Sequence, residues 1–261
     1  MYPNLIDLGF LHLKTYGACM ALGFVLCWKL VERLSGRKDL SDLMMYLMVG
    51  GVVGSRIAYV IEHWRAEFAA NPLSVVRVDQ GGLVFYGGLI LSILIFFAWC
   101  AVKRERPLAL ADILCTVIPL GHACGRVGCF FYGCCWGRVS GSPLAVSFPR
   151  MSPAWYDQVA HGLIDSSAQR SLPVLPTQLF EAAALLVLFA VLLAVFFRWR
   201  RFTAGAYLMG YAAVRFGMEY LRGDPRAAVA FLSIGQTISV GMALLGAAFI
   251  WLSHERPRNN G

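Results

Sequence analysis

The sequence predicts an all-α integral membrane protein with about seven transmembrane helices. Of its 261 residues, 58% are hydrophobic and only 15% are charged, and the mean hydropathy is +0.62. A soluble domain is typically about 45–50% apolar and about 25% charged, because it must cover its surface with polar groups. Several apolar stretches are also long enough to cross about 30 Å of hydrocarbon as helices. These observations exclude a disordered chain and argue against a soluble globular domain.

Seven apolar stretches are the predicted spans, and the fourth is short and contains Pro119. They are Tyr16–Leu34, Leu43–Ile61, Leu83–Val102, Leu108–Ala123, Thr177–Phe197, Ala204–Leu221 and Leu232–Leu252. The first is too long for a signal peptide and lacks a basic leading region and a small-residue cleavage site. Residues 126–176 form a long Gly-, Ser- and Pro-rich loop between spans four and five, and such loops are often functional. We expect one transmembrane domain over residues 1–261 that includes this loop.

Basic clusters follow every odd-numbered span and predict the orientation. They are Arg33, Arg37 and Lys38 after the first span, Lys103, Arg104 and Arg106 after the third, Arg198, Arg200 and Arg201 after the fifth, and Arg256 and Arg258 after the seventh. The positive-inside rule places such clusters in the cytoplasm. The N-terminus and the long loop are therefore expected outside and the C-terminus inside. Because topology explains most of the net charge of +8, a nucleic-acid partner is not expected.

Among the ionisable residues within or at the ends of the predicted spans, topology does not explain Arg56, Glu181, Arg215 and Glu219. A charge at membrane depth costs roughly 2.5–3.5 kcal/mol on insertion scales, so such residues usually face a bundle interior and mark function. Arg215 and Glu219 are four residues apart and share a helix face, and Tyr211 and Arg222 extend that stripe. The pair either holds helices together or belongs to an anion site near the outer leaflet. Arg56 and Arg126 at a similar level favour the anion site.

The segment from Gly121 to Arg138 is rich in glycine and carries Arg126 where span four ends. Glycine lets backbone amides approach an anionic head group closely, and a guanidinium offers a two-pronged donor that suits phosphate. If the helix continues through Arg126, His122 shares its face. His122 is then either a proton acceptor beside the phosphate or a hydrogen-bonding group between helices.

This segment resembles the signature of the prolipoprotein diacylglyceryl transferases, approximately G-R-x-G-N-F-x-N-x-E-x-x-G. Arg126, Gly128, Phe130 and Gly137 match it as they stand. The resemblance extends along nearly the whole chain, through Tyr16-Gly17, residues 54–59, residues 81–83 with Gly87-Gly88, residues 176–181, Arg215-Phe216 with Glu219, and Gly235-Gln236. It also implies seven spans with an outside N-terminus.

The resemblance implies transfer of the sn-1,2-diacylglyceryl group of phosphatidylglycerol to the lipobox cysteine thiol of a prolipoprotein, with release of glycerol phosphate. This is the first step of lipoprotein maturation, at the outer face of the bacterial cytoplasmic (inner) membrane, and it implies no cofactor. The catalytic residues would be Arg126 and Arg215 on the phosphate, Glu219 as a partner of Arg215 or as the base, and Tyr86 and His122. The substrate-binding residues would be Arg126, Arg56, Tyr16, Gln178, Glu181, Gly128 and Gly137.

The chain departs from the family pattern at the polar positions of the signature. Cys129 and Tyr132 stand in place of asparagines and Cys134 in place of glutamate, and Tyr86 stands where many members carry histidine. Tyr86 would donate a hydrogen bond to phosphate rather than accept a proton, so the general base stays open. The alternative function is that of a diverged paralogue that binds lipid or transports lipid or anions.

Four cysteines gather in the same segment: Cys124, Cys129, Cys134 and Cys135. Their spacing does not match the usual short zinc patterns, and we expect no metal site. A disulfide among them is an alternative in an oxidising compartment; otherwise they are small packing residues.

Overall fold

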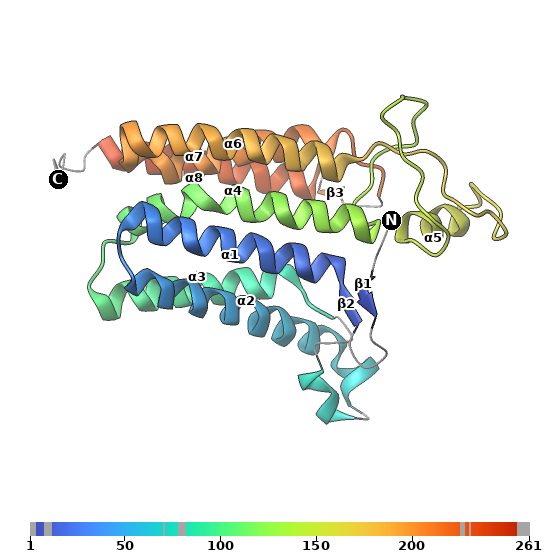
Figure 1. The fold of residues 1–261 in the computed structure, drawn as a ribbon, viewed down its shortest axis with the longest axis horizontal. Coiled ribbons are helices and arrows are strands. Elements are labelled where there is room, and N and C mark those ends of the chain that lie inside the picture. The colour runs from blue at the N-terminus through green and yellow to red at the C-terminus, as the bar shows by residue number, and fades with distance from the viewer. Residues whose placement is uncertain are drawn as a thin grey trace. The chain divides into compact units, whose positions relative to one another are not determined.

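The computed structural model describes residues 4–7, 12–69, 71–77, 82–224, 228–229 and 231–254. Gly81, Arg256 and Arg258 lie outside the described residues. The chain forms two compact units, a larger one of residues 1–27 and 111–261 and a smaller one of residues 28–110. The strands are two short antiparallel pairs, β1 (Asn4–Asp7) with β2 (His12–Lys14) and β3 (Ala228–Val229) with β4 (Leu232–Ser233). The rest of the regular structure is helical (Figure 1).

Each predicted apolar segment lies wholly or mostly in a long helix; the spans predicted from Leu83, to Leu221 and from Leu232 extend two residues beyond theirs. These helices are α1 (Thr15–Ser35), α2 (Asp39–His63), α3 (Phe85–Lys103), α4 (Pro107–Tyr132), α6 (Thr177–Trp199), α7 (Thr203–Glu219) and α8 (Ile234–His254). Within the described part of the chain, five helical stretches are long and apolar enough to cross a membrane: Asp39–Phe68, Phe85–Lys103, Pro107–Tyr132, Thr177–Glu219 and Ile234–His254. The prediction of an all-α integral membrane protein is confirmed at this level. The count of seven spans, the orientation and the single domain stay predictions.

The fourth helix is longer than the sequence suggested. It continues through Pro119 to Tyr132, whereas the predicted span ended at Ala123, so Arg126 lies on a helix and the loop begins only after Tyr132. The reason is packing within the larger unit. A Cβ at Gly121 would lie 3.0 Å from Cys27 Sγ, and one at Gly128 would lie 3.1 Å from the Tyr16 ring. These glycines share one face of α4 and let α1 pack closely along it, which stabilises the helix beyond the apolar run.

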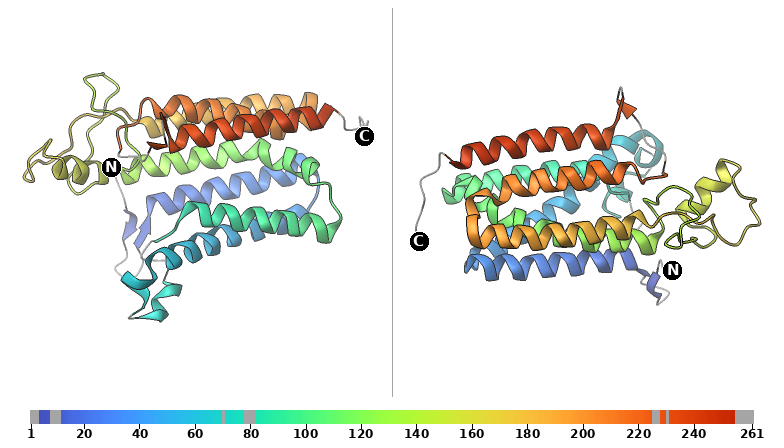
Figure 2. Two further views of the ribbon diagram at one scale, coloured as in Figure 1. Left: turned by 180° about the vertical axis from the view of Figure 1, so that it is seen from behind. Right: turned by 90° about the horizontal axis from the view of Figure 1, so that it is seen from above.

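The other helices of the larger unit pack against one another. α7 contacts both α6 and α8 (Figure 2). Ala123 of α4 and Leu185 of α6 form a buried cluster against which Tyr211 of α7 packs. At the opposite end of α7, buried Asp112 accepts a hydrogen bond from the Ala204 backbone amide at 2.9 Å. α4, α6 and α7 therefore form one packed group.

The segment between α4 and α6 is folded. It contains α5 (Pro153–Ala160), whose N-cap Ser152 accepts a hydrogen bond from the Trp155 amide. Its own small core consists of Trp136, Phe148, Ala154 and Val174. This core anchors residues 133–137 next to the beginning of α6, where Gly137 N donates to Leu175 O at 2.9 Å.

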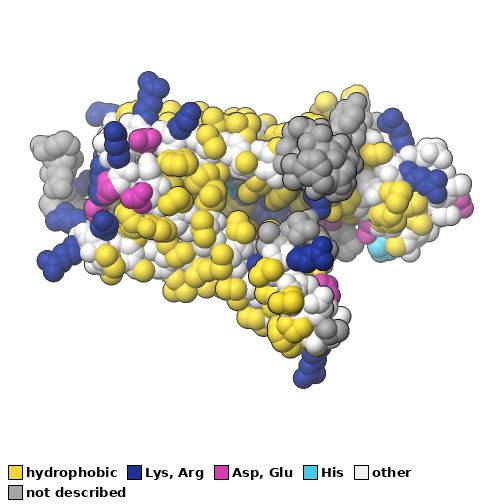
Figure 3. Space-filling view, turned by 60° about the horizontal axis from the view of Figure 1, so that its bottom comes forward, with side chains coloured by type: hydrophobic (Ala, Val, Ile, Leu, Met, Phe, Trp, Pro, Cys, Tyr) yellow, Lys and Arg dark blue, Asp and Glu magenta, His cyan; other side chains and the backbone are white. Residues whose placement is uncertain are grey.

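In the smaller unit α2 and α3 pack closely through glycines. A Cβ at Gly54 would lie 2.5 Å from the Gly87 carbonyl oxygen, so a side chain there would force the helices apart. After α2 come a π-helical turn, η1 (Trp64–Phe68), and a 3₁₀ turn, η2 (Pro72–Val76). Large hydrophobic side chains on the outward faces of both helices are exposed, among them Ile57 and Ile90. Hydrophobic side chains likewise cover much of the helical surface in Figure 3, as a lipid-facing surface requires.

Candidate active site

Arg126 and Glu181 form a buried ion pair between α4 and α6. Arg126 Nη2 lies 3.0 Å from Glu181 Oε1, and the two side chains are 15% and 1% exposed. Glu181 lies one turn into α6, where the positive end of the helix dipole favours an anion. Burying charges is costly unless they are paired, so each side chain holds the other in this apolar setting.

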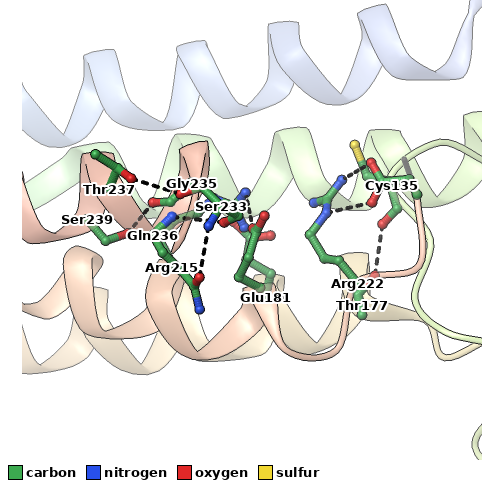
Figure 4. Close-up of polar contacts among 12 residues, drawn as sticks. Cys135, Thr177, Glu181, Arg215, Arg222, Ser233, Gly235, Gln236, Thr237 and Ser239 are labelled. Atoms are coloured by element: carbon green, nitrogen blue, oxygen red, sulfur yellow. Dashed lines mark hydrogen bonds and ion pairs between the residues drawn. The ribbon is translucent and has the colours of Figure 1, made fainter. Parts of the chain in front are cut away.

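Arg215 and Glu219 form a second ion pair on α7. Arg215 Nη2 lies 2.6 Å from Glu219 Oε2, and both side chains are nearly buried. The start of α8 covers the pair: a Cβ at Gly235 would lie 2.8 Å from both of these atoms. Gln236 holds the backbone there. Its side-chain Oε1 accepts a hydrogen bond from Ser233 N at 3.1 Å, and its backbone N–H donates to Ser233 Oγ. Figure 4 shows Arg215, Gly235 and Glu181 grouped together.

His122 and Tyr211 lie close to both ion pairs. Their ring centroids are 5.2 Å apart. His122 lies within electrostatic range of both Arg126 and Arg215, and Tyr211 within range of those arginines and Glu181. The structure therefore brings Arg126, Arg215, Glu219, Glu181 and His122, all predicted from the sequence, into one polar cluster of the larger unit.

Several polar atoms of this cluster are buried without a hydrogen-bond partner among the described residues. They include Arg126 Nε, Arg215 Nη1 and Gln178 Oε1. Gln178 is held in place because its Nε2 donates to the Cys134 carbonyl oxygen at 2.6 Å. A buried polar group without a partner is uncommon and often belongs to a site that binds something. Two guanidinium donors in such a position suit an anionic oxygen.

The glycines of the signature serve the packing of the backbone. A Cβ at Gly137 would lie 2.7 Å from the Leu175 carbonyl oxygen and 2.7 Å from Thr177 Cγ2. Gly128 faces the Tyr16 ring, as described above, and Tyr16 itself is 41% exposed. Contact of these three residues with substrate stays a prediction.

Arg56 and Tyr86 belong to the smaller unit. The Arg56 guanidinium donates to the carbonyl oxygens of Val75, Ser74, Gly82 and Arg77 at 2.8, 2.9, 3.1 and 3.1 Å. It also lies over the rings of Tyr59 and Phe68. Arg56 therefore holds the chain that follows α2, a structural task that the sequence did not indicate. Tyr86 is 55% exposed at the start of α3.

Comparison with known proteins identifies the family of the chain. A sequence profile described as prolipoprotein diacylglyceryl transferase matches residues 3–252. The chain belongs to this family. It is similar to proteins named phosphatidylglycerol–prolipoprotein diacylglyceryl transferase from several bacteria. The relative from Bordetella bronchiseptica is 34% identical over 98% of this chain and 96% of its own length. The relative from Aeromonas hydrophila subsp. hydrophila is 31% identical over 98% of this chain and 92% of its own length. The relative from Pseudoalteromonas translucida is 31% identical over 95% of this chain and 92% of its own length. The resemblance seen in the sequence is confirmed.

In this prolipoprotein diacylglyceryl transferase family member, three of the four clustered cysteines meet. The sulfurs of Cys129, Cys134 and Cys135 all lie within 4.8 Å of one another, and all eight cysteines of the chain are free thiols. Cys124 instead faces α1, where a Cβ at Gly23 would lie 2.9 Å from Cys124 Cβ. We refer to Cys129, Cys134 and Cys135 as the thiol cluster.

Arg222 lies beside the thiol cluster, which differs from the sequence prediction. The stripe of Arg215 and Glu219 was expected to continue to Arg222, but α7 ends at Glu219 and the chain turns. Arg222 is buried and donates to both carboxylate oxygens of Asp224, at 2.8 and 2.7 Å. Hydrogen bonds from the Cys129 and Cys134 thiols, together with the Arg222 charge, lower the pKa of the Cys135 thiol. Hydrogen bonds with the Cys129 and Cys135 sulfurs, in which Cys134 keeps its proton, raise the pKa of the Cys134 thiol.

Proposed function

We propose that this chain transfers the sn-1,2-diacylglyceryl group of phosphatidylglycerol to the lipobox cysteine thiol of prolipoproteins and releases glycerol phosphate. Membership of the family and the names of the relatives support a transferase with phosphatidylglycerol and a prolipoprotein as substrates. The observation that carries the site is the joining of Arg126 and Arg215 in one buried cluster, each with a guanidinium nitrogen that has no partner among the described residues.

The arginines provide fixed positive charge for the leaving phosphate. In the transfer, a sulfur–carbon bond forms and the carbon–oxygen bond to phosphate breaks, so the electron pair of that bond leaves on a phosphate oxygen. Preorganised cations that face this developing charge lower the barrier. Arg126 supplies a guanidinium from α4 and Arg215 one from α7. Glu181 and Glu219 keep both side chains in place, and Gln178 lines the same cluster.

The thiol must lose its proton before it attacks. A free cysteine has a pKa near 8.5, and the thiolate is the nucleophile. His122 lies on α4 near both arginines, with its ring 5.2 Å from that of Tyr211. Glu219 forms an ion pair with Arg215, with Oε2 at 2.6 Å from Nη2. The identity of the general base is therefore open between His122 and Glu219, as in the sequence.

The orientation belongs to the same proposal. Seven helices cross the bacterial cytoplasmic (inner) membrane with the N-terminus outside and the C-terminus in the cytoplasm. This arrangement is supported by basic residues in the last turns of three helices that end odd-numbered spans: Arg33 on α1, Lys103 on α3 and Arg198 on α6. It places the folded segment 133–176 and the arginine cluster at the outer face. The bilayer delivers phosphatidylglycerol and the membrane-anchored prolipoprotein laterally.

Complementation tests the proposed reaction. A bacterial strain depleted of its own diacylglyceryl transferase should grow when it expresses this chain, and its lipoproteins should carry the diacylglyceryl group. An inserted, folded protein that gives neither growth nor modified lipoproteins would contradict the proposal and favour the alternative of a lipid-binding or transport paralogue. Detection of the chain in the membrane fraction is the control for expression.

A further inference from the structure

The thiol cluster is held by the backbone on two sides. Cys129 lies in the last turn of α4, and its carbonyl oxygen accepts hydrogen bonds from Gly133 N at 2.9 Å and Cys134 N at 3.2 Å. On the other side, the first turn of α6 fixes the two following cysteines. Thr177 Oγ1 donates to the Cys135 carbonyl at 2.8 Å and Gln178 Nε2 to the Cys134 carbonyl at 2.6 Å. The three sulfurs therefore meet on a fixed framework.

The backbone of Cys135 is itself strained. Its φ is +62°, and that of Gly133 is +82°. Glycine adopts the left-handed region readily, but for cysteine it is uncommon, and such strain persists mainly where the surrounding structure requires it, often at functional sites. These two left-handed residues reverse the direction of the chain, so that the sulfurs of Cys134 and Cys135 both approach that of Cys129. This turn is the reason why sequence spacing did not reveal the cluster.

The thiol cluster fits a soft metal ion that is coordinated by three sulfur ligands. Zinc binds thiolate sulfur at about 2.3 Å, which places the sulfurs of a tetrahedral site about 3.8 Å apart. The observed limit of 4.8 Å needs only a small closure of the side chains. Thiolate ligands select zinc and other soft ions. Three thiolates leave a divalent ion one net negative charge, and the guanidinium of the Arg222–Asp224 pair lies beside Cys135. A zinc site with three protein ligands keeps a fourth position open, as catalytic sites do.

We propose that Cys129, Cys134 and Cys135 bind one zinc ion, and that its open fourth position binds the sulfur of the acceptor cysteine. The second half rests on the proposed function. A thiol that coordinates zinc is deprotonated, and its proton passes to solvent. The zinc-bound sulfur then attacks the glyceryl carbon, the carbon–oxygen bond breaks, and its electron pair leaves on phosphate. No atom changes oxidation state. The product thioether is neutral and a weaker ligand, so it leaves the zinc.

The position of Arg126 supports this role. It lies three residues before Cys129, on the same face of α4, and within electrostatic range of Cys129 and Cys135. The acceptor thiol would then be held on the zinc ion and the phosphate that it displaces on the neighbouring Arg126. The metal supplies thiol activation next to carboxylates that are held in ion pairs with the arginines.

Zinc binding is tested on the purified full-length chain in detergent under reducing conditions. After incubation with zinc and removal of excess by a weak chelator, elemental analysis should find one zinc per chain. Cys134→Ser and Cys135→Ser should each weaken binding by about 100-fold or more, since each removes a ligand (loss of a mere outer-shell contact already costs about 10–100-fold). The matched control is Cys115→Ser, on the same helix fourteen positions before Cys129, which should bind like the parent chain.

The open position is tested with cobalt in place of zinc and without phosphatidylglycerol. A peptide with the lipobox cysteine should change the visible absorption of the bound cobalt, and the same peptide with serine should not. The metal site would be overturned if the parent chain bound no stoichiometric zinc, or if Cys134→Ser bound zinc as tightly as the parent chain. A disulfide within the thiol cluster of protein isolated from membranes would overturn it too. Zinc binding without a response to the cysteine peptide would overturn the substrate role. Zinc and peptide binding without any transfer would instead contradict the proposed function.

Discussion

At the residue scale, Arg56 and Arg126 both lie in apolar helices, but their partners differ. Arg56 donates to four carbonyl oxygens of the chain that follows α2. Arg126 pairs with a carboxylate, and its Nε has no partner among the described residues. The cost of an intramembrane charge identified both positions in the sequence. It could not distinguish them, because the carbonyl groups that satisfy Arg56 belong to turns with no sequence signature.

Replacement of Arg56 tests its structural task. Arg56→Ala removes the donors to residues 74–77 and to Gly82. We expect faster cleavage after residues 74–77 by limited proteolysis and a loss of about 1–3 kcal/mol in stability, because part-buried carbonyls lose charged donors. Arg77→Ala is the control, since Arg77 is exposed and takes part in these contacts only through its backbone. Unchanged proteolysis of Arg56→Ala would contradict the assignment.

At the element scale, the start of α8 shapes the second ion pair through the absence of a side chain at Gly235. The sequence identified Gly235-Gln236 only through the family resemblance. Neither periodicity nor turn chemistry shows that a glycine faces Arg215 from another helix. For the same reason the predicted end of α4 at Ala123 was wrong: glycines that read as a loop are contact points for α1.

Two glycines of α8 provide a matched pair of variants. Gly235→Ala places a methyl group about 2.8 Å from Arg215 Nη2 and Glu219 Oε2, so the ion pair must move, and we expect transfer to fall by about 10-fold or more while helix content is kept. Gly241→Ala meets nothing within 4 Å and should leave transfer unchanged or raise stability slightly, because alanine favours helix. Equal activity of the two variants would argue against a role for the Arg215–Glu219 geometry.

At the scale of the whole molecule, hydropathy and basic residues were sufficient to predict an all-helical membrane protein and the positions of its long helices. They did not predict the folded core of residues 133–176, because Trp136, Phe148 and Val174 occur in a stretch without periodicity. Nor did they predict the thiol cluster, which depends on the left-handed backbone of Cys135.

The orientation can be measured in intact cells. An epitope inserted at Gly141, which has open space around it, should bind antibody in spheroplasts without permeabilisation. An epitope inserted after Arg104, at the end of α3, should bind only after the membrane is permeabilised. The reverse pattern would invert the topology and place the arginine cluster at the cytoplasmic face.

The central claim, that Arg126 acts on the phosphate of the lipid donor, is tested most directly by transfer from phosphatidylglycerol to a lipobox peptide. Arg126→Ala should lower kcat/KM by at least about 100-fold, the loss typical of one preorganised donor. Arg126→Lys should recover little, because an ammonium cannot give two parallel hydrogen bonds. Arg170→Ala, in an exposed part of segment 133–176, should retain parental activity. Transfer near the parental rate by a folded Arg126→Ala protein would contradict the account.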